Sequence, residues 1–179
     1  MKLINLFVLS LFLYVFLFSS HFVGIFAQEI NVEGKKVDYN LPYPGILPDN
    51  PLYSVKSLRD KLWLFFIRDY TKKSELLLLF SDKKIAMAQE LSSKGKWSLG
   101  SEYMLLAERD FEKLVSVMNN AKKQGASPQG DFILRAKLSN EKHREIIEDV
   151  LIKTPQGERT NLEEALKLNE RLQQKLSKL

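Results

Sequence analysis

The sequence contains no cysteine and only two histidines among its 179 residues. The absence of cysteine excludes disulfide-stabilised scaffolds, thiolate metal sites and cysteine nucleophiles. With 45% hydrophobic and 27% charged residues, the composition is that of an ordinary globular chain rather than a disordered one. The folded part must therefore be stabilised by apolar packing alone.

Acidic side chains are also absent from the first 27 residues, where Lys2 is the only lysine or arginine. Residues 3–18 are almost entirely apolar, and the small residue Ala27 precedes a polar stretch. This pattern predicts either a signal peptide cleaved near Ala27 or an uncleaved signal anchor, because about 20 apolar residues can span a bilayer. In both alternatives the rest of the chain is extracytoplasmic, either secreted or anchored in the cytoplasmic membrane by residues 3–26.

Residues 28–50 are expected to form a linker, since Pro42, Pro44 and Pro48 lie within seven positions and a helix cannot cross them. Tyrosines and aliphatic residues interleave these prolines, so we expect residues 42–48 to lie on the domain and residues 28–39 to be loose. The predicted organisation is a signal peptide or signal anchor at 1–27, a linker at 28–50, a helical domain at 51–159 and a C-terminal amphipathic helix at 160–179.

From residue 52 onward, apolar residues recur at helical spacing, and no window alternates apolar and polar residues long enough to form a sheet. Helices are expected at about 51–67, 71–95, 97–124, 127–153 and 160–179. Gly95 and Gly125 are expected to end the second and third helices, and Thr160 with Glu163 to form a capping box at the start of the last. The predicted fold class is all-α, a bundle of four to five helices.

The first helix carries six consecutive apolar residues at positions 62–67, more than a single stripe needs. A domain without disulfides needs a thick core, so we expect this helix to lie centrally with Trp63 and Phe66 buried. The alternative is that Leu64 and Ile67 face a membrane or a partner. The run widens an apolar stripe that consists of Leu52, Val55, Leu58, Leu62 and Phe65.

The last helix repeats apolar residues in steps of three and four, a heptad pattern with the polar Asn169 at an a-like position. The seam is shorter than three heptads, so it either packs on the parent bundle or forms a coiled coil through self-association or with an envelope protein. Together with the first helix, it supplies the candidate interaction surface. The residues of that surface are Leu64, Ile67, Leu162, Asn169, Leu172 and Leu176.

Residues 43–53 read YPGILPDNPLY, and the apolar run 62–67 and the segment KKSEL at 72–76 follow. Over about residues 43–125 the chain resembles an exported bacterial domain-of-unknown-function family, numbered 5667. The resemblance implies an exported helical domain, at the surface or membrane-associated in a bacterial cell envelope, without an assigned activity. It implies no functional residue.

His143 is the one histidine beyond the export segment, which excludes a ferritin-like site with two Glu-x-x-His pairs. Arg144 follows it, so the His-Glu-x-x-His motif of zinc proteases is absent as well. Because its neighbours in sequence are charged, we expect His143 to be solvated. One alternative is a haem or metal carrier with a methionine opposite His143, the candidates being Met87, Met104 and Met118. No metal ligand, cofactor or catalytic residue is predicted.

Acidic residues cluster on two helices, where interleaved lysines and arginines are typical of an exposed, salt-bridged face. The alternative is an envelope enzyme that cleaves glycan with paired carboxylates. The clustered acids are Glu102, Glu108, Asp110, Glu112, Glu145, Glu148 and Asp149.

The net charge of +5 is dispersed as lysine pairs, which argues against a nucleic-acid partner and is compatible with an anionic membrane or wall polymer. We therefore expect a structural or interaction module at the cell envelope, and not an enzyme.

Overall fold

The computed structural model describes residues 36–126 and 130–179, so the predicted export segment lies outside the described residues. Within these two ranges the chain has no strand, which confirms the predicted all-α class. No helix in the same ranges is both long and apolar enough to cross a membrane. The helices are α2 (Tyr53–Phe66), α3 (Tyr70–Ser93), α4 (Trp97–Lys123), α5 (Gly130–Lys153) and α6 (Thr160–Leu176), with a 3-10 turn, η2 (Gln156–Glu158), before α6.

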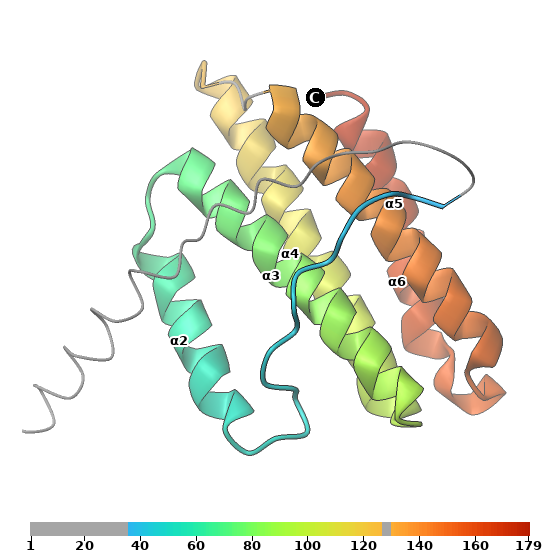
Figure 1. Ribbon diagram of the computed structural model, residues 1–179. Coiled ribbons are helices and arrows are strands. Elements are labelled where there is room, and N and C mark those ends of the chain that lie inside the picture. The colour runs from blue at the N-terminus through green and yellow to red at the C-terminus, as the bar shows by residue number, and fades with distance from the viewer. Residues whose placement is uncertain (1–35, 127–129) are drawn as a thin grey trace, which may run out of the picture.

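Four of these helices form a bundle in up-down-up-down order, and α2 lies beside it next to the start of α3 (Figure 1). Both α3 and α6 pack on α4 and on α5, which closes the bundle around one core. Short connections between antiparallel neighbours are typical of such bundles. The observed arrangement confirms the predicted bundle and leaves α2 as its least enclosed helix.

Glycines end α3 and α4 as the sequence predicts. Gly95 has a φ of +75° and Gly125 a φ of +78°, the left-handed conformation that ends many helices. The predicted capping box of Thr160 and Glu163 is wrong, because Arg159 already has helical backbone angles and makes no side-chain cap. The Nε of Arg159 instead donates to the carbonyl of Thr154 at 2.8 Å, which ties the start of α6 to the end of α5.

The apolar core divides into two clusters along the bundle axis. One is centred on Phe111 and Met118, and the other on Ile85 and Met104, all fully buried. Between the two clusters, at the level of Glu108, the inward-facing positions of the helices carry polar side chains. These positions continue the three- and four-residue spacing of the apolar residues. The bundle is therefore two apolar halves separated by a polar layer.

The heptad seam of α6 lies inside this bundle. Leu162, Asn169 and Leu172 have no exposed surface, and Leu176 is 1% exposed. Packing on the parent bundle is thus the alternative observed, with α4 and α5 as its neighbours. These four members of the candidate interaction surface are covered by the chain itself.

The expectation of a centrally placed first helix is wrong. No residue of α2 is buried, Phe66 is 65% exposed and Trp63 only half-buried. The alternative, in which Leu64 and Ile67 face outward, is not observed either. Leu64 packs against the core cluster of Phe111, and Ile67 is half-buried. The main apolar stripe of α2 is therefore exposed, and its half-buried side mixes polar residues with Trp63 and Leu64.

The segment before α2 runs along the bundle (Figure 1). Leu47 is buried, as expected for the stretch 42–48. The expectation of a loose chain up to residue 39 is wrong for its described part, because Tyr39 is buried and the backbone N–H of Val37 donates to Glu145 at 3.1 Å. Tyr39 is held in place by a hydrogen bond from its hydroxyl group to the buried carboxylate of Asp82.

Candidate functional site

A buried polar layer crosses the bundle, and each of its four helices, α3 to α6, contributes one side chain to the centre of the layer. Asp82 of α3, Glu108 of α4, His143 of α5 and Asn169 of α6 are all at most 3% exposed. Charged groups almost never bury without partners, so such a layer is either functional or tightly paired. Its hydrogen bonds distinguish these two cases.

His143 bridges the two carboxyl groups of the layer. Its Nδ1 lies 2.8 Å from Oε1 of Glu108, and its Nε2 lies 2.9 Å from Oδ1 of Asp82. Ionised carboxylates only accept hydrogen bonds, so this geometry favours a positively charged ring in which both nitrogens donate. Burial by itself lowers the pKa of His143, but the hydrogen bonds and charges of Asp82 and Glu108 raise it to about 9.

The two carboxyl groups accept from further donors as well. The Tyr39 hydroxyl donates to Oδ2 of Asp82 at 2.6 Å, and Ser139 Oγ donates to Oδ1 at 2.5 Å. Asn169 Nδ2 donates to Oε2 of Glu108 at 3.2 Å. Because every carboxylate oxygen has a donor and His143 is wholly enclosed, the layer fixes helix register and holds the incoming segment at Tyr39.

The expectation of a solvated His143 is wrong because immediate sequence neighbours lie on other faces of a helix. Residues three, four and seven positions away share its face, and Ala136, Ile147 and Val150 are all buried. The same spacing places Glu108 between Met104 and Phe111. Heptad register applied to polar residues would have found the layer from sequence.

The layer is not arranged to bind a metal or haem. No group of three or more histidine, aspartate or glutamate side chains in the described ranges could hold a metal ion. Both ring nitrogens of His143 already face carboxylates, and Met104 and Met118 are enclosed in the two core clusters. A haem iron would have to displace a buried charge pair to reach an axial nitrogen.

The predicted salt-bridged face is confirmed for Glu112, Glu145 and Glu148, which pair with Lys175, Lys142 and Arg144. It is wrong for two of the clustered acids. Glu108 belongs to the polar layer, and Asp110 is buried and pairs with Lys84 and Lys113.

Stability is expected to fall as the pH rises from about 6.5 to above 9. A group whose pKa is raised in the folded state contributes stability that is complete below its unfolded pKa and is lost as the pH passes its folded pKa. For His143, the rise from 6.5 to about 9 corresponds to about 3 kcal/mol. Urea unfolding of the wild type and of His143→Gln across this range measures the effect.

Other groups titrate in the same pH range. The difference in unfolding free energy between the wild type and His143→Gln therefore isolates the contribution of His143. Burial lowers the pKa of Lys56 to about 8, which gives a contribution of opposite sign above that pH. A difference that stays constant with pH would show that His143 is not charged in the folded protein.

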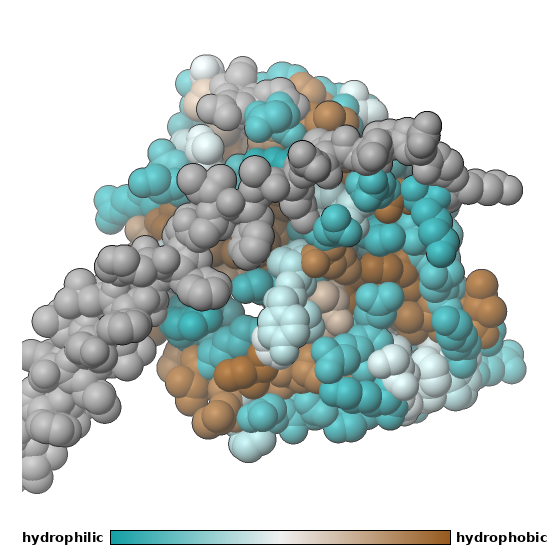
Figure 2. All heavy atoms as spheres, viewed as in Figure 1, coloured by the Kyte–Doolittle hydropathy of each residue, from teal (hydrophilic) through white to brown (hydrophobic). Residues whose placement is uncertain are grey.

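A second feature is the outer face of α2, formed by Leu52, Val55, Leu58, Leu62, Phe65 and Phe66. Val55 is 68% exposed and Phe65 is 78% exposed. Eight of the ten exposed large hydrophobic residues in the described ranges lie between positions 43 and 66, with Tyr43 and Ile46 completing the set. Figure 2 shows hydrophobic residues gathered at the lower left, where α2 lies in Figure 1.

The opposite side of α2 faces the bundle and carries polar residues as well as Leu64. Lys56, Ser57 and Asp60 line a small hollow against α3 and α4. The ring of Tyr53 packs edge-on to Tyr103 at 5.6 Å between centroids, and Lys56 Nζ donates to the carbonyls of Pro44 and Ile46. A surface helix of a soluble protein normally has the reverse orientation.

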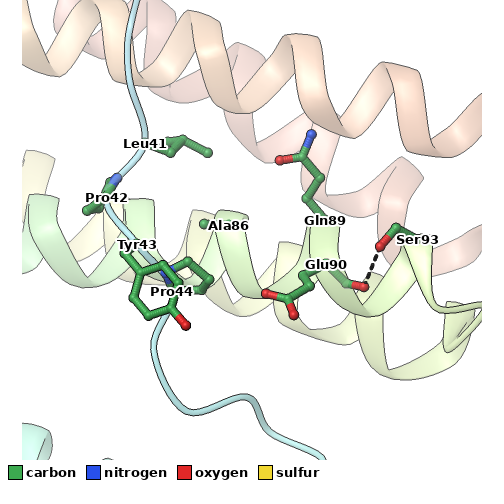
Figure 3. Close-up of a pocket in the computed structure, with 8 residues that line it drawn as sticks. All are labelled: Leu41, Pro42, Tyr43, Pro44, Ala86, Gln89, Glu90 and Ser93. Carbon is green, nitrogen blue, oxygen red and sulfur yellow. Dashed lines mark hydrogen bonds between the residues drawn. The ribbon is translucent and has the colours of Figure 1, made fainter.

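A shallower hollow lies where residues 41–44 pass over α3 (Figure 3). Leu41, Pro42 and Tyr43 form one wall, and Gln89 and Glu90 of α3 form the other. Neither this hollow nor the one beneath α2 contains carboxylates from both acidic clusters. The hollow beneath α2 has two carboxylates, Asp60 and Asp110, and both pair with cationic side chains.

These features define a class, a four-helix bundle with an outer helix that presents its apolar side to the surroundings. The chain belongs to the family described as domain of unknown function (DUF5667), whose model matches residues 45–157. The match extends beyond the expected limit near residue 125, through α5 and into η2. Searches of curated proteins and of solved structures found no match.

Proposed function

We propose that the chain is a non-catalytic interaction module of the cell envelope, resting on an anionic membrane surface through the outer face of α2. The observation that carries this proposal is the orientation of α2, with Lys56 and Asp60 toward the bundle and Leu58 and Phe65 toward solvent. Exposed apolar faces of this kind are typical of contact sites for membranes or partners.

The composition of α2 and its surroundings supports a lipid surface as the partner. Helices that lie in the membrane interface combine leucine and phenylalanine on one side with lysine and arginine around it. The exposed bases near the outer face are Arg59, Arg68 and Lys72. Each base near an anionic leaflet contributes about 1 kcal/mol of attraction.

The acids nearby offset these bases only in part. Asp60 pairs with Arg59 at 2.8 Å, and Asp69 accepts from the backbone N–H of Lys72 at the start of α3. The rim of the outer face is therefore positively charged overall, complementary to anionic lipid.

The order of segments along the chain also supports this proposal. Twenty-four residues separate Ala27, the end of the predicted export segment, from Leu52. An N-terminal segment retained in a bilayer would keep α2 close to that bilayer. If the segment is cleaved, α2 would supply membrane attachment by itself, with the affinity of an interfacial helix.

A fluorescence experiment can locate the membrane contact, because a chain without cysteine accepts a single probe. We expect an environment-sensitive fluorophore on Leu58→Cys of the full chain to shift to the blue on vesicles of phosphatidylcholine and phosphatidylglycerol. Lipid-attached nitroxides should quench it. The same probe on Ile152→Cys, at a side chain 77% exposed on α5, should remain unchanged.

A substitution pair tests the energetics of the same face. Leu58→Ser with Phe65→Ser should abolish the probe response at Val55→Cys, because burying two such side chains contributes about 3–6 kcal/mol. The matched control is Leu134→Ser with Ile152→Ser, which alters two exposed apolar residues outside α2. Equal probe responses at positions 58 and 152, or dimerisation through α2 without lipid contact, would contradict the proposal.

A further inference from the structure

The polar side of α2 encloses a hollow of about 120 Å³ between α2, α3 and α4. This volume is below the range of about 300–1,000 Å³ typical of pockets for drug-sized ligands, so only a small group fits. Its walls carry hydroxyl, ammonium and carboxylate groups as well as apolar side chains. The lining residues are Tyr53, Lys56, Ser57, Asp60, Lys61, Leu64, Phe80, Lys83, Lys84, Met87, Asp110 and Lys113.

Positive charge dominates this hollow, with five lysines against two aspartates. Both aspartates already have cationic partners. Asp110 accepts from Lys84 and, at 2.7 Å, from Lys113, and Asp60 pairs with Arg59 outside the hollow. The excess positive charge is therefore not neutralised within the described part of the chain.

Two of the five lysines are unpaired within the described part of the chain. Neither Lys61 nor Lys83 makes a hydrogen bond or ion pair with any residue that the structure describes, although Lys83 is half-buried. Half-burial of a lysine removes part of the hydration of its charge, and the charge of Asp60 offsets this loss only in part, because burial still lowers the pKa of Lys83. Lys83 thus lines the hollow with an ammonium group whose hydrogens no described residue accepts.

Lys56 is fixed at the base of the hollow. Its Nζ donates to the carbonyl of Pro44 at 3.1 Å and lies 5.5 Å from the centre of the Tyr53 ring. Burial lowers the pKa of Lys56 to about 8; the charge of Asp60 opposes this shift, and the charges of Lys83 and Lys84 add to it. Burial also lowers the pKa of Lys83. An anion among these groups would relieve their mutual repulsion.

We propose that the hollow between α2, α3 and α4 binds a phosphate group, with Lys61, Lys83 and Lys56 as its cationic donors and Ser57 as a neutral one. Lysine binds phosphate as a point charge and needs no fixed bidentate geometry, which suits ammonium groups carried by two helices. The phosphate could come from a lipid headgroup or from a small soluble phosphate. This site is separate from the outer face of α2, and each is testable without the other.

Thermal unfolding of the full chain in uncharged detergent tests the site with inorganic phosphate, at constant ionic strength set by chloride. We expect a saturable rise in Tm, because a ligand that binds only the folded state stabilises it. Lys61→Gln with Lys83→Gln should weaken the apparent affinity at least about ten-fold, since bonds to charged groups are the strong ones.

The matched control is Lys153→Gln with Lys167→Gln, which removes the same charge from exposed positions on α5 and α6. It should keep the full phosphate response. Equal phosphate responses of the two double variants would overturn the proposal by reducing the effect to general charge screening.

The source of the phosphate is resolved by a second arm, in which vesicles of phosphatidylcholine with phosphatidic acid replace inorganic phosphate. A loss of binding in Lys61→Gln with Lys83→Gln but not in the control, without any response to inorganic phosphate, would identify a lipid headgroup. A response to neither probe would overturn the proposal. Retention of the inorganic phosphate response by Leu58→Ser with Phe65→Ser would show that this site does not depend on membrane docking.

Discussion

Replacing His143 with leucine is expected to destabilise the bundle by about 3–5 kcal/mol. The ring is fully enclosed, and both of its nitrogens are bonded to carboxylates, so its removal leaves Asp82 and Glu108 buried without a cation. Such a loss is a large share of the roughly 5–15 kcal/mol that stabilises a typical domain. Urea unfolding monitored by circular dichroism measures it.

A charge-free version of the layer separates the charge effect from a packing effect. The triple variant His143→Gln, Asp82→Asn and Glu108→Gln keeps polar groups of similar size and removes every formal charge of the layer. It should recover much of the stability lost in His143→Leu, because no uncompensated charge remains buried. A loss below about 1 kcal/mol in His143→Leu, the scale of a surface substitution, would contradict the paired arrangement.

Deleting residues 160–179 is expected to abolish the cooperative unfolding transition. The deletion removes α6, whose buried side chains belong to both core clusters, Leu162 to one and Leu172 and Leu176 to the other. Burial of each leucine contributes about 1.5–3 kcal/mol, so the four leucines buried in α6 together approach the whole stability of a domain. Differential scanning calorimetry of the full and shortened chains measures the outcome.

Asn169→Leu is the milder companion to this deletion. A polar residue at the a-like position of a free coiled coil costs stability, so its replacement there would stabilise. Inside this bundle, Asn169 donates to Glu108 and to the carbonyl of Asn140, so we expect a loss of about 1–3 kcal/mol. An unchanged unfolding transition after the deletion, or an increase in stability in Asn169→Leu, would instead indicate that α6 is a partner-binding helix.

The sequence by itself determined the helical class and most helix boundaries, because both depend on local interactions. Apolar spacing repeats over each helix regardless of what covers it, and Gly95 and Gly125 adopt left-handed angles that other residues avoid. Where a boundary depended on a side chain, local reasoning was less secure. Arg159, the residue before α6, has helical backbone angles, so Thr160 lies inside the helix and does not cap it with Glu163.

Only the tertiary structure decided which side of α2 faces the bundle and which of the buried polar residues pair with one another. A stripe such as Leu58 and Phe65 shows that one side is apolar, but the same pattern fits a core or a membrane. The side chains that α3 and α4 place against α2 determine which of its sides faces the bundle. Among them are lysines and Asp110, which lie against the polar residues of α2. Likewise, His143 is buried because Asp82 and Glu108, 61 and 35 residues away along the chain, converge on its two nitrogens. Such a pairing depends on how helices are placed in space, which local spacing does not encode.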